Sequence, residues 1–151
     1  MQRYLPSWSS LEYPRRLDAQ QRGQMVQVIA WEGDEPVGRG MVLFPAHEEH
    51  STSADREGCA EVRDVFVAPH RRREGVARAI MTSLEGAARG AGTARIGLSV
   101  SLGDDAAPAR ALYAELGYRP AHGPYISSMT LATNDGPMPV GALMTYLVKD
   151  L

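Results

Sequence analysis

Apolar and polar residues in the first half of the chain follow patterns typical of β-strands. Residues 25–31 (MVQVIAW) and 37–44 (VGRGMVLF) are rich in strand-forming side chains, and residues 32–36 (EGDEP) between them have the composition of a tight turn. Residues 61–67 (EVRDVFV) predict a further strand, which Pro69 ends. The first two segments should therefore pair as a hairpin.

Two later segments have the 3.6-residue spacing of amphipathic helices. Residues 75–89 carry an apolar stripe that is followed by glycines, and glycine commonly ends a helix. After a strand at residues 96–100, a second helix should begin near Asp104 or Asp105 and end at Gly117. The apolar stripes consist of Val76, Ile80, Leu84 and Ala87 in the first helix and of Ala109, Leu112, Tyr113 and Leu116 in the second.

The two ends of the chain complete the pattern. Strands near residues 118–126 and 143–148 are expected, separated by a Pro/Gly-rich stretch at 134–141, whereas residues 1–22 predict a short helix that prolines interrupt. The order strand, helix, strand, helix, strand, strand predicts an α/β fold with a mixed β-sheet flanked by helices. Residues 1–151 should form one domain.

Composition places the chain among ordinary globular proteins. Hydrophobic residues make up 44% and charged residues 23%, and the formal net charge of -2 argues against a general nucleic-acid or membrane binder. No apolar run is long enough for a membrane span and no signal-peptide pattern begins the chain, so a cytoplasmic setting is expected. Cys59 is the only cysteine, which excludes an intrachain disulfide.

Residues 45–60 form a long polar stretch and predict a loop. It contains four adjacent residues of metal-binding types: His47, Glu48, Glu49 and His50. Adjacent residues in a loop cannot easily converge on one ion, so we interpret these side chains as solvated and expect no metal.

The segment between the strand at 61–67 and the following helix has the composition of an anion-binding turn. Amide N–H groups at a helix start lack partners and carry partial positive charge, which suits phosphate oxygens. Gly75 and the small Ala77 leave this backbone accessible, and the arginines at 71–73 can add charge-assisted contacts. The same residues also fit an ordinary solvated turn, and taken alone they leave both interpretations open.

This turn resembles the signature of the GNAT superfamily of acyl-CoA-dependent N-acetyltransferases, Arg/Gln-x-x-Gly-x-Gly/Ala. Arg72, Gly75 and Ala77 match its positions, and the strand before it ends V-x-P, as in that family. Residues 111–118 (ALYAELGY) resemble the family's LYEKLGF block, and the end of the chain resembles its final strand. The resemblance covers about residues 24–151 and implies a GNAT-like fold with a shortened N-terminus.

Three features differ from the family pattern. Only a short, proline-broken segment precedes Met25, so the family's first strand is absent from the prediction. Ala106 stands where the family often has an asparagine that contacts CoA, and Arg63 stands where many members have a glutamate base. These differences bear on cofactor contact and on catalysis.

The resemblance implies acetyl-CoA as the co-substrate. Its pantetheine arm would pair with the backbone of residues 65–67, where a main-chain N–H would polarise the thioester carbonyl. Its pyrophosphate would lie on the amides of residues 72–77. The residues implied in cofactor binding are Val65, Phe66, Val67, Arg72, Arg73, Glu74, Gly75, Val76, Ala77 and Arg78.

The resemblance also implies that Tyr113 protonates the leaving thiolate, although its place on an apolar stripe fits simple packing as well. The base is open among Glu61, Asp64 and His122. Strict strand alternation places Glu61 on one face with Arg63, Val65 and Val67, and Asp64 on the other with Val62 and Phe66.

The implied activity is transfer of an acetyl group from acetyl-CoA to a primary amine, by direct attack on the thioester. A small-molecule or peptide amine is the expected acceptor, with no nucleic-acid or membrane partner, and a homodimer is left open. The alternative is a catalytically weak, CoA-binding regulatory or interaction module of the same fold. A third interpretation is a small α/β domain with an incidental basic turn.

Overall fold

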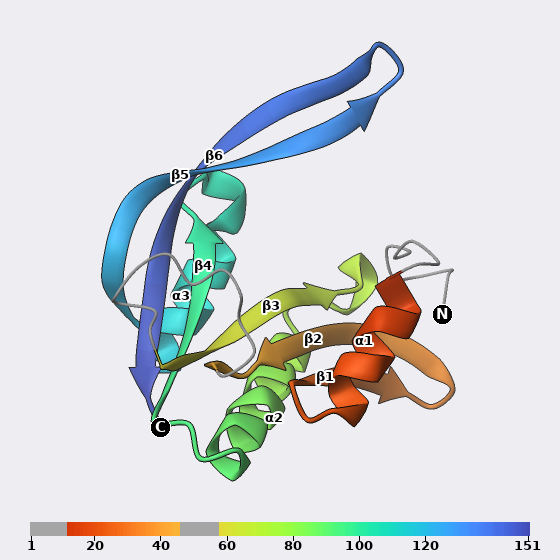
Figure 1. The fold of residues 1–151 in the computed structure, drawn as a ribbon, viewed down its shortest axis with the longest axis vertical. Helices are drawn as coiled ribbons and strands as arrows, with labels where there is room; N and C mark the ends of the chain where they lie inside the picture. The colour runs from red at the N-terminus through yellow and green to blue at the C-terminus, as the bar shows by residue number, and fades with distance from the viewer. Residues whose placement is uncertain (1–11, 46–57) are drawn as a thin grey trace. The chain divides into compact units, whose positions relative to one another are not determined.

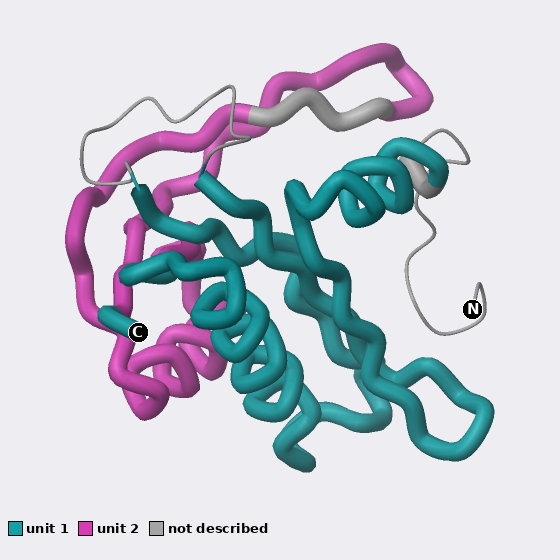
Figure 2. The backbone as a smooth tube through the Cα atoms, turned by 60° about the horizontal axis from the view of Figure 1, so that its bottom comes forward, with its two compact units in different colours: residues 1–96, 150–151 teal, residues 97–149 magenta. Residues whose placement is uncertain are grey.

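The computed structural model describes residues 12–45 and 58–151 (Figure 1). The fold class is α/β, as predicted: six strands of a mixed sheet and three α-helices make up the described residues. The chain forms two compact units, residues 1–96 with 150–151 and residues 97–149 (Figure 2). Each unit has its own pattern of strand pairing.

The first unit is built on three antiparallel strands in the order β1-β2-β3. Strand β1 (Met25–Glu32) and β2 (Glu35–Leu43) form the predicted hairpin, with Gly33 at φ 57° in its turn. Strand β3 (Cys59–Val67) pairs with the other edge of β2 and begins two residues before the predicted strand. The strand-forming side chains of these three segments therefore predicted the strands correctly.

Helix α1 (Glu12–Gln21) was only partly anticipated. Pro14 does not interrupt it, because the residue lies in the first helical turn, where a missing N–H removes no intrahelical hydrogen bond. The helix contacts β1, and the Gln20 side chain accepts a hydrogen bond from the Gln27 amide at 2.9 Å.

Helix α2 (Val76–Gly90) packs closely on β2, opposite two glycines of that strand. A Cβ atom at Gly38 would lie 2.9 Å from Cδ1 of Ile80, and one at Gly40 would lie 2.8 Å from Cγ2 of the same side chain. The predicted apolar stripe is buried at Ile80 and Leu84, and full burial of such a side chain contributes roughly 1.5–3 kcal/mol. This contact holds the helix against the sheet and so determines where its N-terminus lies.

The second unit contains most of β4 (Arg95–Ser101), α3 (Ala107–Glu115), β5 (Arg119–Thr133) and β6 (Gly136–Asp150). The strand order is β4-β6-β5, and β5 and β6 are antiparallel. Gly117 follows α3 at φ 93°, as the sequence predicts for a left-handed helix end.

The prediction that the Pro/Gly-rich stretch at residues 134–141 separates the last two strands is wrong for most of its length. Pairing between β5 and β6 continues to Thr133 and Gly136, so only residues 134–135 form the turn. Pro137 and Pro139 are two residues apart and direct their nitrogens, which carry no hydrogen, to the same edge of β6. Pairing along the opposite edge is compatible with both prolines.

Tyr146 is fully buried in the second unit, and its ring occupies the space above Gly97 of β4. A Cβ at Gly97 would lie 2.7 Å from Cε1 of Tyr146 and closer still to its hydroxyl oxygen. This position in β4 therefore requires glycine for packing.

We expect Gly97→Ala to lower the free energy of unfolding by about 1–3 kcal/mol, because the added methyl overpacks a closed site. Gly86→Ala is the matched control: a Cβ at this exposed position of α2 meets nothing within 4 Å. Higher helix propensity should make that variant about 0.5–1 kcal/mol more stable. Urea unfolding of both variants measures the difference, and equal stabilities would contradict the packing argument.

Candidate active site

Strand β3 contains a β-bulge between Arg63 and Phe66. Arg39 of β2 pairs with Phe66, and Met41 of β2 pairs with Arg63. The step between these two pairs is therefore two residues long on β2 and three residues long on β3. Asp64 lies within the bulge at φ 54°, in the left-handed region. Such a conformation costs roughly 1–2 kcal/mol for most L-residues and is more accessible to aspartate. A bulge leaves its extra residue outside the strand ladder.

The bulge changes which side chains share a face of β3. Strict alternation predicts Phe66 on the face of Val62 and Val67 on the face of Glu61, and both predictions are wrong. One extra residue reverses the alternation beyond Arg63, so Phe66 lies on the face of Glu61 and Val67 lies on the other. No local signal in the sequence marks the bulge, because it arises from pairing with β2.

Both carboxylates predicted as bases on β3 are paired with arginines. Glu61 is largely buried and accepts a hydrogen bond from Nε of Arg63 at 3.1 Å. An oxygen of Asp64 lies 2.9 Å from a guanidinium nitrogen of Arg16, which belongs to α1. Arg16 was not among the predicted site residues, since its partner is far away in the sequence.

The predicted anion-binding turn has the expected backbone. A short 3-10 helix, Pro69–Arg71, follows β3, and α2 begins after Gly75, which is left-handed at φ 85°. Gly75 provides no capping side chain, and the first helical hydrogen bond runs from the Ala79 amide to its carbonyl oxygen at 3.0 Å. The preceding amides at the helix start are therefore without a side-chain cap and carry the positive end of the helix dipole.

The three arginines of this turn have different surroundings. Arg71 pairs with the carboxylates of Glu32 and Glu74, the latter at 3.3 Å. Nε of Arg72 donates to the carbonyl oxygen of Val67 at 3.1 Å, which ties the turn to the end of β3. Arg73 is exposed at φ 68°, and among the described residues it has no ion pair or hydrogen bond. Arg73 is therefore available to an incoming anion.

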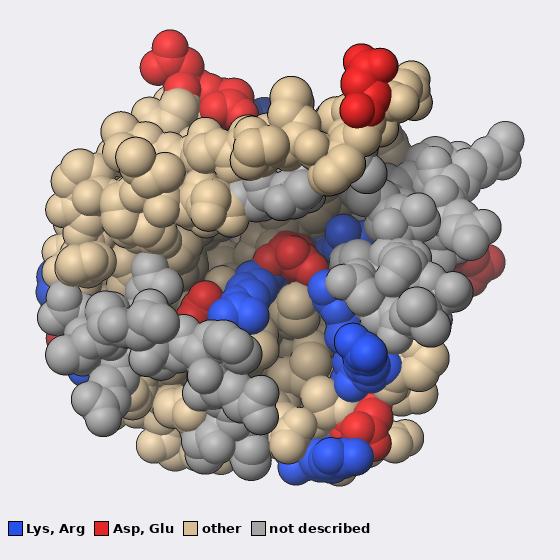
Figure 3. Space-filling view, turned by 45° about the horizontal axis from the view of Figure 1, so that its top comes forward, with Lys and Arg blue, Asp and Glu red and all other residues tan. Residues whose placement is uncertain are grey.

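The ring of Phe66, a residue of β3, is close to two arginines, one of them in this turn. The guanidinium carbon of Arg72 is 5.8 Å from the ring centroid, and that of Arg39 is 5.7 Å from it. Contacts of this kind contribute roughly 0.5–1 kcal/mol at exposed sites. Basic and acidic side chains also gather in neighbouring patches on the face of the molecule shown in Figure 3.

Tyr113 lies on α3 in the second unit and is 8% exposed. Its ring packs edge-on against Tyr118, with 5.9 Å between centroids. Burial raises the pKa of the Tyr113 phenol above its ordinary value of 10.0. The hydroxyl therefore stays protonated at neutral pH, which is the state a proton donor requires. Ala106 precedes α3 and offers no side-chain cap.

A second polar group in this unit joins β4 to β5. The hydroxyl of Tyr125 donates to Oγ of Ser99 at 2.5 Å, and the exposed ring of His122 stacks on Tyr125 with 6.2 Å between centroids. The sequence suggested His122, whereas Ser99 has no signal beyond its place on a strand.

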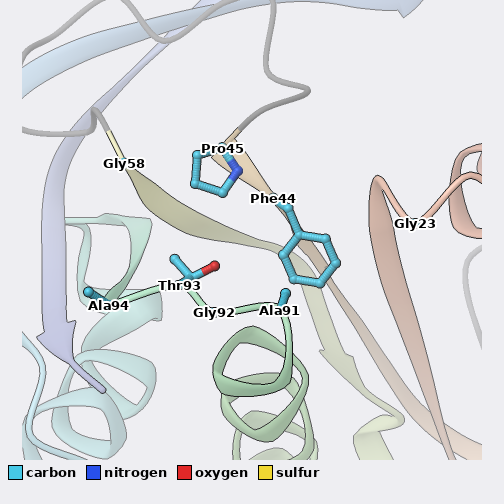
Figure 4. Close-up of a pocket in the computed structure, with 8 residues that line it drawn as sticks. All are labelled: Gly23, Phe44, Pro45, Gly58, Ala91, Gly92, Thr93 and Ala94. Atoms are coloured by element: carbon cyan, nitrogen blue, oxygen red, sulfur yellow. The ribbon is translucent and has the colours of Figure 1, made fainter.

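A hollow of about 390 Å³ lies in the first unit at the other end of α2 (Figure 4). The residues that line it are Gly23, Phe44, Pro45, Gly58, Ala91, Gly92, Thr93 and Ala94. None of these carries an ionisable side chain, so this hollow lacks the groups that would hold a phosphate or catalyse acyl transfer.

Within residues 12–45 and 58–151, no group of three or more His, Cys, Asp or Glu side chains is placed so that it could bind one metal ion. His47, Glu48, Glu49 and His50 lie outside the described residues. Of the helices described, none is both long and apolar enough to cross a membrane.

The fold is similar to that of solved N-acetyltransferases. A ribosomal-protein-alanine N-acetyltransferase from Brucella melitensis is 17% identical, with a TM-score of 0.67 over 98% of this chain and 83% of the other. The yncA protein from Salmonella typhimurium, solved with its cofactor acetyl-CoA, is 14% identical, with a TM-score of 0.67 and coverage of 99% and 79%. The PaiA N-acetyltransferase from Thermoplasma acidophilum, in complex with coenzyme A, is 11% identical, with a TM-score of 0.64 and coverage of 95% and 72%. At these identities the similarity shows the fold.

The family follows from the sequence match. Residues 1–118 match the model of the Acetyltransferase (GNAT) family, which is well over half of the chain. The protein therefore belongs to the GNAT acetyltransferases. The match begins earlier in the chain than the predicted resemblance, which started at about residue 24. No curated protein matches the sequence.

We expect the Tyr113 phenol to titrate above pH 10, because burial opposes its ionisation. NMR titration of tyrosines labelled at Cζ measures this, and the Tyr113→Phe spectrum assigns the resonance. The unfolded chain releases this proton at about pH 10, before the folded protein does, so Tyr113 lowers stability above that pH. A titration at or below pH 10 would show that burial does not control this hydroxyl.

Proposed function

We propose that the protein transfers an acetyl group from acetyl-CoA to a primary amine. The observation that carries the proposal is the uncapped start of α2 at the left-handed Gly75, which follows the bulged strand β3 after a short 3-10 helix. Arg73 is free among the described residues to add charge to a bound pyrophosphate. Membership of the GNAT acetyltransferases and the similar folds solved with acetyl-CoA or coenzyme A support the same conclusion.

In the proposed reaction the amine nitrogen attacks the thioester carbonyl carbon, and the C–S bond breaks as the amide forms. The two reactants must be held in line, which is the largest contribution to the rate. The backbone N–H freed by the bulge in β3 polarises the carbonyl oxygen, which gains negative charge during the attack. Acetyl-CoA lies along residues 65–67, with its pyrophosphate at residues 72–77.

Two side chains are proposed to move protons. Tyr113 donates its phenolic proton to the departing thiolate, and its raised pKa keeps that proton in place at neutral pH. The amine loses its proton to a carboxylate through a water molecule. Both carboxylates pair with an arginine, but Glu61 lies in the regular ladder, whereas Asp64 belongs to the bulge, so Glu61 is the preferred candidate. The phenolate formed on Tyr113 is reprotonated from solvent when the products leave.

The acceptor class is best determined by experiment. Proteins of this fold include N-acetyltransferases that act on the alanine of ribosomal proteins, so a peptide N-terminus and small amines are both suitable probes. An acyl-transfer assay with acetyl-CoA over a panel of peptide and small-molecule amines tests the proposal. Tight acetyl-CoA binding without transfer to any amine would instead support a CoA-binding module of the same fold.

We expect Gly75→Glu to abolish acetyl-CoA binding measured by calorimetry. The new carboxylate would stand at the helix start and repel the pyrophosphate, and a side chain would obstruct the close approach of the backbone. Gly92→Glu is the matched control, because Gly92 has a similar φ of 79° and its Cβ would also meet nothing within 4 Å. It lies beyond the other end of α2, so its acetyl-CoA affinity should be unchanged. Native affinity in a folded Gly75→Glu protein would refute the phosphate site.

We expect Tyr113→Phe to lower kcat by on the order of 100-fold, because the ring is kept and the proton donor is lost. Acetyl-CoA affinity should change little, so the loss should appear in kcat alone. Tyr118→Phe removes a hydroxyl from another buried tyrosine of the same unit and should retain activity. Full activity in Tyr113→Phe would mean that Tyr113 only packs and that the thiolate leaves without its help.

A further inference from the structure

The ion pair between Arg16 and Asp64 joins α1 to the bulge of β3. The two charged groups are 2.9 Å apart, and the side chain of Arg16 is only 18% exposed. Asp64 is the bulge residue with a left-handed backbone, a conformation that glycine adopts far more readily. A strained conformation of this kind persists only where its surroundings hold it, and here Arg16 supplies the contact.

Both faces of the first unit's sheet constrain the bulge. Helices α1 and α2 lie on opposite faces of these strands (Figures 1 and 2). On the α2 side, a Cβ at Gly40 of β2 would lie 3.4 Å from Cγ2 of Val65 and 2.8 Å from Cγ2 of Ile80, so this part of the ladder is closely packed. On the other side, Arg16 holds the side chain of Asp64. The extra residue of β3 is thereby held at one position along the strand.

We propose that Arg16 is a positioning residue for acyl transfer: by pairing with Asp64 it holds the bulge of β3 in register, and so directs the freed backbone N–H at the thioester carbonyl. This inference rests on the proposed function. Loss of the bulge would shift the register of the strand beyond it by one residue, which would reverse its faces and remove that free N–H. Asp64 then acts through its conformation and its ion pair, not as the base.

Infrared spectroscopy of bound acetyl-CoA labelled with ¹³C at the carbonyl tests this without knowledge of the acceptor. A hydrogen bond to the thioester oxygen lowers the carbonyl stretching frequency, so the full-length protein should shift the band relative to free acetyl-CoA. Arg16→Met and Asp64→Ala should lose most of this shift and still bind acetyl-CoA with nearly native affinity. Asp64→Gly should keep most of it, because glycine adopts the left-handed conformation without the ion pair.

Arg22→Gln is the matched control, in the turn that directly follows α1. Arg22 forms an exposed ion pair with Asp18 of α1 at 2.8 Å, and its loss should leave the carbonyl band unchanged. Once an acceptor is known, Arg16→Met should lower kcat by about 10- to 100-fold, with the pH profile keeping its shape. A base role for Asp64 would instead remove one limb of the pH profile in Asp64→Gly.

Several outcomes separate the inference from the proposed function. A native band shift in Arg16→Met, accompanied only by a lower unfolding midpoint, would make the ion pair merely structural and overturn the inference. Loss of the shift in Asp64→Gly to the same extent as in Asp64→Ala would also overturn it. Acetyl-CoA bound to the native protein without any shift would refute the positioning role and leave cofactor binding standing. Failure of the native protein to bind acetyl-CoA at all would refute both proposals.

Discussion

The close packing of α2 against β2 is the contact on which the candidate site depends. Gly38 and Gly40 leave room for Ile80, and any larger side chain at either position would push the helix away from the sheet. Because α2 is rigid, the same contact sets the position of its first amides relative to the end of β3. The candidate anion-binding turn therefore owes its geometry in part to the packing of Val76 and Ile80 on the glycines of β2.

The bulge in β3 shows how a strained backbone is maintained next to the candidate anion-binding turn. A continuous strand would keep the regular ladder with β2, whereas the bulge leaves one residue outside it. The ion pair of Asp64 with Arg16 lies at the bulge itself. Arg39 and Arg72 lie near the ring of Phe66, at the end of the bulge closest to the turn. Electrostatic contacts here serve mainly to position backbone groups, since isolated surface ion pairs add little to stability.

In the second unit the relevant effect is the burial of the Tyr113 hydroxyl away from water. Tyr113 is buried against Tyr118, and its hydroxyl is kept neutral by the cost of placing a phenolate away from water. Close packing also defines this unit elsewhere, because Tyr146 occupies the space that a side chain at Gly97 would need. The two units thus differ in kind: one orders backbone amides and charges, and the other buries a titratable hydroxyl.

The sequence by itself determined what depends on neighbouring residues. The strands, the apolar stripe of α2, the left-handed Gly117 and the glycine at the start of α2 all have short-range signals. The family follows from the match over residues 1–118, which include the turn at Gly75. Tertiary structure decided what depends on residues far apart in the chain. Pairing with β2 creates the bulge at Asp64, pairing with β5 turns a Pro/Gly-rich stretch into strand, and folding brings Arg16 to its carboxylate. Register and ion pairs are set between segments, so no local pattern could specify them.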